Sequence, residues 1–282
     1  MGSKLIIRDR CFEWGQCTYI MGVLNVTPDS FSDGGEFNSL SAALSQAQAL
    51  VAAGADIIDV GGQSTRPGAE QISLETELNR VVPIIQALRP EISVPISVDT
   101  TRATVAKASI EAGADIINDI SGGTFDPEML PTVASLDVPI VLMHIRGTPQ
   151  TMQQMTDYED VVGEIASFLR QQIAIATNLG INAEKIIIDP GIGFAKNYEQ
   201  NLEILRRLRS LRSLNCPILV GVSRKSFIGR ILNQPEPKAR VWGTAAACCA
   251  AIVNGADILR VHDVKEMSDV SLVTDALFRA SQ

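Results

Sequence analysis

Eight short apolar runs along the chain each end at a polar or ionisable residue. The runs cover residues 19–24, 57–58, 94–98, 116–117, 138–143, 186–188, 218–222 and 258–261, and they end at Asn25, Asp59, Asp99, Asn118, His144, Asp189, Ser223 and His262. Burying such groups without partners is costly. If the runs are parallel strands, these groups form one ring at one face, where a barrel enzyme holds its active site.

The spacing of these strand ends predicts a closed α/β barrel. The shortest interval, from Asp99 to Asn118, is 19 residues, so every interval has room for the crossover that parallel strands require. Eight such units in 282 residues fit a (β/α)8 TIM barrel better than a doubly wound sheet, which normally has a glycine-rich first turn. We expect residues 1–18 to form a short N-terminal β-hairpin extension and residues 19–282 to form a single barrel domain.

Two kinds of local signal mark the helices between the strands. Residues 53–59, 112–118 and 254–260 read AGADIID, AGADIIN and NGADILR. In each, the glycine is predicted to end a helix in the left-handed conformation, and a strand follows two or three residues later. An apolar stripe predicts another helix between Val161 and Leu179, and Thr156 and Glu159 have the spacing of a capping box at its start.

The composition excludes several classes of protein. The chain is 46% hydrophobic and 20% charged, which is typical of a globular protein and not of a disordered one. Its formal net charge of −8 argues against a nucleic-acid surface, but it leaves room for a local basic pocket of Arg224, Lys225 and Arg260. No apolar run approaches the ~20 residues that span a bilayer, and N-terminal charges interrupt any signal-peptide core. We therefore expect a cytoplasmic protein.

Two long loops over the presumed active face are candidate lids. Residues 25–35 read NVTPDSFSDGG and residues 61–68 read GGQSTRPG. Both are long for joints between a strand and a helix. Ordinary surface loops are the alternative interpretation. The charged residues Asp29, Asp33 and Arg66 favour loops that close on a substrate and exclude water.

The remaining strand ends divide by charge. Asp99, Asn118 and Asp189 each have the residue type that caps a following helix, but three on one rim predict a ligand rich in N–H donors, such as an amino-pyrimidine edge. Ser223–Ser226 and residues 260–263 follow the seventh and eighth strands, the usual phosphate site of this fold. We therefore expect Lys225, Arg260 and His262 to bind an anion. A Schiff base at Lys225 is the rival interpretation. Asp59 and His144 receive no firm task.

Taken together, these segments resemble the dihydropteroate synthase family. The matching motifs, in family order, are NVTPDSFSDGG at 25–35, GGQSTRPGA at 61–69, ISVDT at 96–100, NDI at 118–120, MH at 143–144, DPGIGF at 189–194, SRKS at 223–226 and RVHD at 260–263. The resemblance implies that the amine of 4-aminobenzoate attacks a dihydropterin that carries a methylene diphosphate. The expected products are 7,8-dihydropteroate and diphosphate, in folate biosynthesis.

The resemblance also implies roles for individual residues. The expected pterin ligands are Asp99, Asn118, Asp189 and Lys225. The diphosphate ligands are Asn25, Arg260 and His262, with Asn25 acting through Mg²⁺. The expected 4-aminobenzoate site consists of Thr65, Arg66, Pro67, Phe194, Lys225 and Ser226. The groups expected to act in catalysis are Asp33, Asp99, Lys225 and Arg260.

One residue departs from the family pattern, and some alternatives stay open. Position 63 is Gln where the family usually has Glu, which removes a charge but keeps an acceptor oxygen. The resemblance implies a homodimer through the late helices and a sulfonamide target, although the alanine-rich stretch 244–251 fits an ordinary barrel helix equally well. A methyltransferase of the same pterin-binding barrel superfamily is the main rival function. A non-catalytic pterin-binding protein and a Schiff-base aldolase are the others.

Overall fold

The structure is a computed structural model that describes residues 4–26 and 36–279. The candidate lid residues Asp29 and Asp33 lie outside the described residues. Among the described residues, no helix combines the length and the apolar character needed to cross a membrane.

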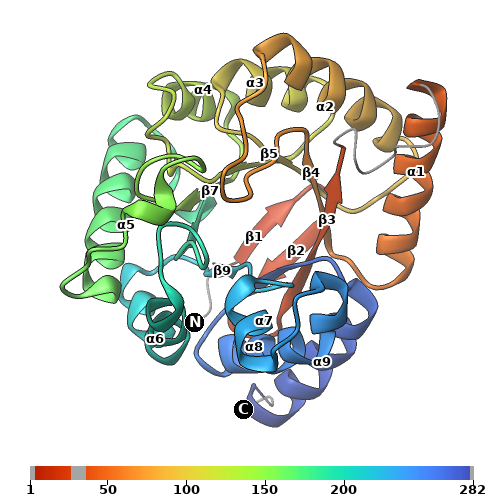
Figure 1. Ribbon diagram of the computed structural model, residues 1–282. Helices are drawn as coiled ribbons and strands as arrows, with labels where there is room; N and C mark the ends of the chain where they lie inside the picture. Colours follow the sequence, from red (N-terminus) through yellow and green to blue (C-terminus); the bar gives the residue numbers. More distant parts are fainter. Residues whose placement is uncertain (1–3, 27–35, 280–282) are drawn as a thin grey trace.

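Eight parallel strands form the centre of the molecule (Figure 1). They are β3 (Tyr19–Asn25), β4 (Ile57–Gly61), β5 (Ile96–Asp99), β6 (Ile116–Asp119), β7 (Ile140–Met143), β8 (Ile186–Asp189), β9 (Leu219–Val220) and β10 (Ile258–Val261). Their order is β8-β7-β6-β5-β4-β3-β10-β9. The ends of this order meet where the Ile188 N–H donates to the Pro217 carbonyl at 2.9 Å. The barrel prediction is thus confirmed.

Helices connect the strands and surround them in Figure 1. They are α1 (Glu36–Ala52), α2 (Leu74–Leu88), α3 (Ala103–Glu111), α4 (Met129–Leu136), α5 (Val161–Asn178), α6 (Tyr198–Arg207), α7 (Ser226–Leu232), α8 (Val241–Val253) and α9 (Val264–Phe278). Short 3-10 turns add η2 (Met152–Gln154), η3 (Ala183–Lys185), η4 (Leu208–Leu214) and η5 (Pro237–Arg240). The main apolar core lies between the outer faces of the strands and these helices.

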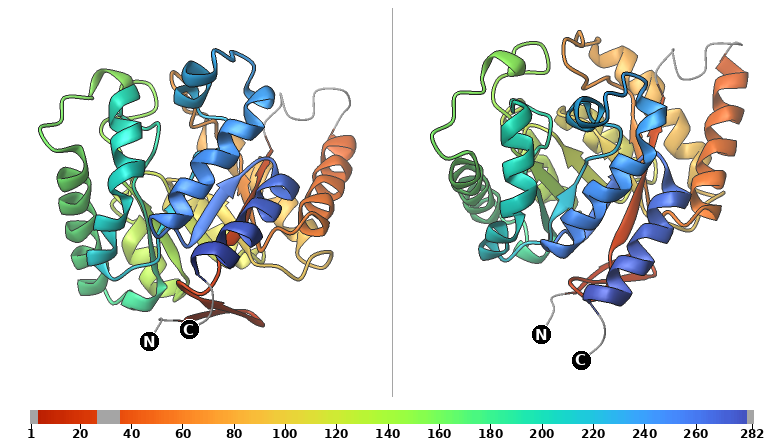
Figure 2. Two further views of the ribbon diagram at one scale, coloured as in Figure 1. Left: turned by 90° about the horizontal axis from the view of Figure 1, so that it is seen from below. Right: turned by 60° about the horizontal axis from the view of Figure 1, so that its bottom comes forward.

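The N-terminal segment closes one end of the barrel. β1 (Lys4–Ile7) and β2 (Arg10–Glu13) pair antiparallel, as the predicted hairpin requires, and Figure 2 shows this hairpin beneath the barrel. A second apolar cluster joins it to the inward-facing strand residues Met21, Ile57, Ile116, Val141, Ile187, Leu219 and Ile258. Because side chains alternate along a strand, residues two positions further along point inward at the opposite end. The division of the chain into an extension and one domain stays an interpretation.

The repeated Gly-Ala-Asp signature forms the predicted joints. Gly54, Gly113 and Gly255 have φ angles of +106°, +113° and +98° directly after helices α1, α3 and α8. The aspartate of each repeat accepts a hydrogen bond from a backbone N–H group at or near the start of a neighbouring strand: Asp56 from Ile20 (2.8 Å), Asp115 from Ile96 (2.9 Å) and Asp257 from Ile218 (2.9 Å). Each also pairs with an arginine: Arg10, Arg89 and Arg212, in the same order. The repeat therefore fixes adjacent strands to each other.

The predicted capping box at Thr156 and Glu159 is wrong. Helix α5 begins at Val161, and its N-cap residue Asp160 makes no side-chain capping bond. Glu164, one turn into the helix, instead accepts hydrogen bonds from the N–H groups of Glu159 and Asp160 at 2.9 and 3.3 Å. The N-terminal N–H groups were correctly expected to need an acceptor, but the acceptor lies further along the chain.

Removing one aspartate of the repeat should destabilise the barrel. Asp257→Ala would leave the N–H groups of Ile218 and Gly15 without their acceptor and Arg212 without its carboxylate partner. We expect the free energy of unfolding to fall by about 3 kcal/mol, measured by urea denaturation. The exposed pair of Lys265 and Asp269 supplies the control, since Asp269→Ala should cost less than about 1 kcal/mol. Equal effects of the two substitutions would contradict this account of the repeat.

Candidate active site

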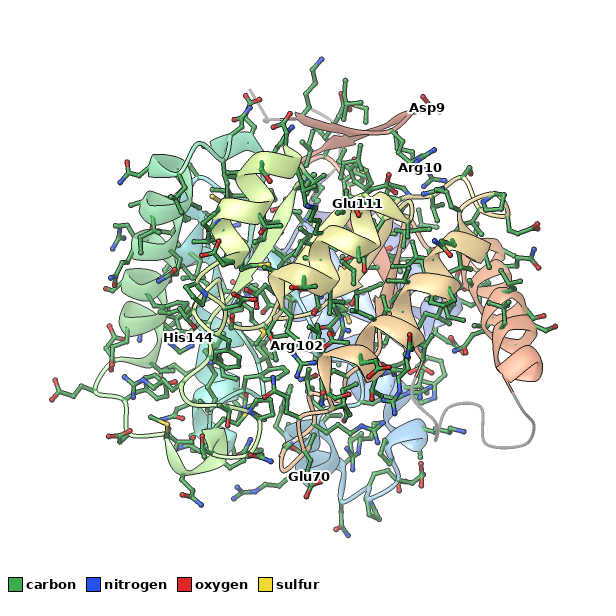
Figure 3. The ribbon with its side chains drawn as sticks, turned by 90° about the horizontal axis from the view of Figure 1, so that it is seen from above. Asp9, Arg10, Glu70, Arg102, Glu111 and His144 are labelled. Carbon is green, nitrogen blue, oxygen red and sulfur yellow. The ribbon has the colours of Figure 1, made fainter. Side chains whose placement is uncertain are left out.

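The mouth of the barrel opposite the hairpin carries the polar strand ends. Figure 3 shows Asp9 and Arg10 beside the hairpin, Glu70 at the opposite end of the molecule, and His144 on the Glu70 side. Strand alternation places Asp59, Asn118, Asp189 and Arg260 inside the barrel, because each lies two residues beyond an interior residue of the hairpin-end cluster. Asp99 also points inward, because it pairs in register with Asn118.

Arg260 occupies the centre of this mouth and joins three strands. Its Nε donates to Asp59 Oδ2 at 2.7 Å, and its Nη2 donates to Asp99 Oδ2 at 2.8 Å. Asn118 Nδ2 donates to the same Asp59 oxygen at 3.2 Å. Strands β4, β5, β6 and β10 are therefore connected through one buried network of side chains.

Asp59 is the member of this network whose role the sequence did not assign. It is 0% exposed, and its Oδ1 atom is a buried acceptor without a hydrogen-bond partner among the described residues. A carboxylate removed from water needs a cation and hydrogen-bond donors to offset its desolvation. Asp59 therefore positions Arg260 and Asn118. The sequence signal was its place at a strand end, but the partner was not readable because it lies 201 residues away.

The network raises the pKa of both Asp99 and Arg260, but for different reasons. Burial raises the pKa of Asp99 to about 7, an effect that the Arg260 guanidinium opposes and the Asp59 carboxylate reinforces. Burial tends to lower the pKa of Arg260, but Asp59 and Asp99 outweigh it, so the pKa rises. Arg260 therefore stays charged, and the two hydrogen bonds leave three of its five N–H groups available for an anion.

Asp189 and Lys225 form a second pair of ionisable groups at the mouth. Asp189 Oδ1 accepts a hydrogen bond from the Gly191 N–H at 2.7 Å. Burial raises the pKa of Asp189 to about 6, against the effects of that hydrogen bond and of Lys225. Burial also lowers the pKa of Lys225 to about 8. The Lys225 ammonium lies 4.4 Å from the centroid of the Phe194 ring, so a cation, a carboxyl group and an aromatic face adjoin one another.

His262 and Arg224 differ from what the sequence suggested. His262 Nδ1 lies 3.0 Å from Ser223 Oγ, and burial, Arg260 and Arg224 lower the pKa of His262 to about 4. The imidazole is therefore neutral at pH 7, and it offers a hydrogen bond to an anion but no charge. Arg224 does not converge with Lys225 and Arg260. Its guanidinium binds both oxygens of Asp263 instead, which ties the two loops together.

Gln63 closes the second loop on itself. Its Nε2 atom donates to the carbonyls of Ser64 and Glu70 at 2.8 and 2.9 Å, and its Oε1 atom accepts from the Ile72 N–H at 2.8 Å. A glutamate lacks the donor for the first two bonds. The departure from the family pattern is therefore matched by contacts that require an amide.

The second loop borders a cavity of about 110 Å³ beside the central network. Thr65, Asp99, Thr100, Phe125 and Pro149 are among the residues that line it. The structure thus brings Thr65 and Asp99 to the same space. Arg66 and Pro67 are exposed and do not line this cavity, and Ser226, the first residue of α7, is also exposed.

The end of β3 offers one oxygen for a divalent cation, Asn25 Oδ1, close to the Asp99 carboxylate that Arg260 already binds. A Cβ atom at Gly61 would lie 3.9 Å from Asn25 Oδ1 and 3.7 Å from Asp99 Oδ2, so both oxygens border the space that this glycine leaves open. Within residues 4–26 and 36–279, no three His, Cys, Asp or Glu side chains form a metal cluster. The Asn25 oxygen suits Mg²⁺, which binds few protein oxygens and retains several waters.

Comparisons with known proteins place the chain in one family. The family model for pterin binding enzymes matches residues 21–262. A dihydropteroate synthase of Synechocystis sp. is 61% identical over 95% of this chain and 93% of its own length. A crystal structure of dihydropteroate synthase from Clostridium difficile in the presence of pteroic acid is 45% identical, with a TM-score of 0.90, over 95% of this chain and 99% of that one. The Xanthomonas albilineans enzyme with 4-aminobenzoic acid is 40% identical, with a TM-score of 0.91, over 98% of both chains.

The raised pKa of Asp189 predicts a pH-dependent cost to folding. The folded carboxyl titrates near pH 6 and its unfolded counterpart near 3.8, so the folded state holds the proton more tightly. Stability is therefore lost as the pH rises from about 4 to above 6, by about 3 kcal/mol. Asp189→Asn should remove this loss. The difference between its free energy of unfolding and that of the wild type should therefore rise in favour of the variant across that pH range. Parallel pH profiles for the two proteins would contradict the assignment, and Asp269→Asn controls for loss of an exposed carboxylate.

Proposed function

The chain belongs to the pterin binding enzyme family, and we propose that the barrel mouth described above carries the dihydropteroate synthase reaction of that family. In this reaction, (7,8-dihydropterin-6-yl)methyl diphosphate and 4-aminobenzoate give 7,8-dihydropteroate and diphosphate. The observation that carries the proposal is that hydrogen-bond acceptors and cations lie side by side in the same mouth of the barrel. Acceptors for a donor-rich heterocycle lie beside Arg260 and Lys225, which suit an anionic leaving group.

The pterin would bind to the acceptor side of the mouth. Asp189, Asp99 and Asn118 offer carboxyl and amide oxygens from three strands. An ionised carboxylate pairs well with the parallel N–H groups of an amino-pyrimidine edge. Asp189 suits this task because donors from the ring would favour its ionised form, which burial alone disfavours. Lys225, next to the Phe194 ring, would border the bound heterocycle on the cationic side.

The diphosphate would bind to the remaining N–H groups of Arg260. His262, held by Ser223, would donate a hydrogen bond, and Asn25 would hold Mg²⁺, which supplies charge neutralisation to the diphosphate oxygens. The carbon–oxygen bond to the diphosphate breaks first in this proposal. Preorganised positive charge at the leaving group is worth more in a buried site than in water. Arg260 is preorganised because Asp59 and Asp99 already fix its orientation.

The pterin methylene cation that remains would be stabilised by carboxylates. Asp99 borders the mouth and the adjacent cavity, and Asp33, which lies outside the described residues, would approach with the first loop. The 4-aminobenzoate nitrogen then forms the new carbon–nitrogen bond and loses a proton. No strong general base is required, because an arylamine nitrogen is largely unprotonated at neutral pH. Thr65, Arg66, Pro67, Phe194, Lys225 and Ser226 would contact this second substrate.

The rival functions are less well supported by the site. A methyltransferase that uses a folate would need Asp99, Asn118 and Asp189 but not the cations Lys225 and Arg260. A non-catalytic pterin-binding protein would not need Arg260 held in place by two buried carboxylates. A homodimer and a cytoplasmic location stay predictions. Exposed apolar side chains on α8 and α9, namely Trp242, Leu272, Val273, Leu277 and Phe278, support the dimer.

The reaction itself provides the direct test. Purified protein, Mg²⁺, the dihydropterin diphosphate and 4-aminobenzoate should yield dihydropteroate and diphosphate in equal amounts, measured by chromatography and a coupled diphosphate assay. Omitting 4-aminobenzoate should abolish dihydropteroate formation. If the complete mixture forms no dihydropteroate with folded protein, the proposed function is refuted.

Substitutions should separate the roles of three residues. Lys225→Ala should raise the KM values for both substrates by about tenfold or more, because Lys225 is assigned to both sites and a lost charged contact costs about 2 kcal/mol. Thr65→Ala should raise the KM for the arylamine substrate alone, and Asp33→Ala should mainly lower kcat. Steady-state kinetics with each substrate varied in turn measures these effects. A selective effect of Lys225→Ala on one substrate would contradict its double assignment.

A further inference from the structure

Lys196 is a buried lysine that the proposed reaction does not use. It is 2% exposed and follows the DPGIGF motif at residues 189–194. Its Nζ atom lies 3.0 Å from His144 Nδ1, 2.7 Å from the Phe194 carbonyl oxygen and 3.4 Å from the His144 carbonyl oxygen. The three acceptors match the three donors of one ammonium group.

His144 acts as an acceptor in this cluster. Burial and the nearby cations Lys196 and Arg146 lower the pKa of His144 to about 2, so its ring is neutral. With Lys196 protonated, its Nζ donates to Nδ1 and the ring hydrogen resides on Nε2. The imidazole packs edge-on to Phe168 with 5.0 Å between the ring centroids. This packing and the contact with Lys196 hold the ring with Nδ1 directed at the Lys196 Nζ atom.

Lys196 connects the end of β7 to the segment that follows β8. Gly191 has a φ angle of +70°, and a Cβ atom there would lie 2.0 Å from the His144 carbonyl oxygen. The segment therefore passes directly against the end of β7. Just before it, the Asp189 side chain accepts from the Gly191 N–H, and the Asp189 carbonyl accepts from the His144 N–H at 3.0 Å. At the other end of the segment, Lys196 holds the Phe194 carbonyl.

We propose that Lys196 is a positioning residue for the pterin pocket, one that clamps residues 190–195 to His144 so that the Asp189 carboxyl group faces the pterin and the Phe194 ring keeps its place beside Lys225. The proposal rests on the proposed function, since it takes the bound heterocycle to be a pterin. Lys196 touches neither substrate. It acts through the two residues that it aligns.

Burial lowers the pKa of Lys196 well below its ordinary value, an effect that the Asp189 carboxylate opposes, so a lysine here is expensive to retain for packing alone. Among the described residues, Lys196 makes no ion pair with a carboxylate, and a methionine would fill similar space without desolvating a charge. The ammonium group also favours the ionised form of Asp189 and so lowers its pKa, against the larger effect of burial. Both the position of residues 190–195 and the ionisation of Asp189 therefore depend on Lys196.

The test compares Lys196→Met with Lys185→Met. Lys185 is the control, because its Nζ also binds a carbonyl, that of Asp137, together with the Asp137 carboxylate, but at the hairpin end of β8. Calorimetric titration with 6-hydroxymethylpterin reports pterin affinity without turnover. We expect Lys196→Met to weaken this affinity by about tenfold or more. The KM for the arylamine substrate should rise by a smaller factor, because Phe194 is also assigned to that site. Lys185→Met should match the wild type in both.

A second variant keeps the test decisive if Lys196→Met does not fold. His144→Ala retains the ammonium and its two carbonyl acceptors, and it should weaken pterin binding in the same direction by a smaller factor. Folded Lys196→Met or His144→Ala that binds the pterin as tightly as the wild type overturns the proposal. So does a loss of pterin affinity in Lys185→Met that is as large as the loss in Lys196→Met. If the wild type itself binds no pterin, the proposed function fails instead, which is a different result.

Discussion

The contacts of Arg260 with Asp59 and Asp99 are the constraint on which the rest of the site depends. Two carboxylates inside a barrel repel each other and lose their hydration, and one guanidinium between them offsets both effects. The same contacts fix the direction of the remaining Arg260 donors. Asp59 also accepts a hydrogen bond from Asn118, which orients that side chain. The structure and the chemistry of the mouth therefore share one group of atoms. A substitution there alters both at once, so stability and activity are hard to separate at this position.

The two ends of the barrel use charge for different purposes. At the hairpin end, Asp56, Asp115 and Asp257 each bind a backbone N–H group and an arginine, and the pairs remain saturated whether or not a ligand is present. At the mouth, donors and acceptors are left over. Arg260 has unused N–H groups, and Asp189 accepts one backbone hydrogen bond where a carboxylate can accept more. The saturated pairs at the hairpin end stabilise the barrel, which offsets the free energy lost to unused donors and acceptors at the mouth.

The architecture was predictable from the sequence because it rests on local periodicity. Apolar runs, their polar ends and the Gly-Ala-Asp joints are all visible within a few residues. The gathering of polar strand ends at one mouth was predictable, but the contacts between them were not. Asp59 and His144 stood at strand ends without a task, because their partners Arg260 and Lys196 are distant in sequence or carried no signal. Arg224 was misplaced for the same reason, since its partner Asp263 is 39 residues away. The acceptor Glu164 shows that even a local rule fails when a neighbouring residue offers better geometry.

The internal hydrogen bonds of Gln63 have a consequence for how substrates enter. A loop that must order itself around a ligand loses conformational entropy at that moment. The loop of residues 61–72 has already lost much of it, because one amide ties together Ser64, Glu70 and Ile72. It contacts the neighbouring loop through a backbone hydrogen bond from Gly68 to Pro149. Arg80 and Arg102 also hold its two ends through the Gly62 and Ile72 carbonyls. A ligand that binds against such a preordered segment loses less of its binding free energy to ordering the loop.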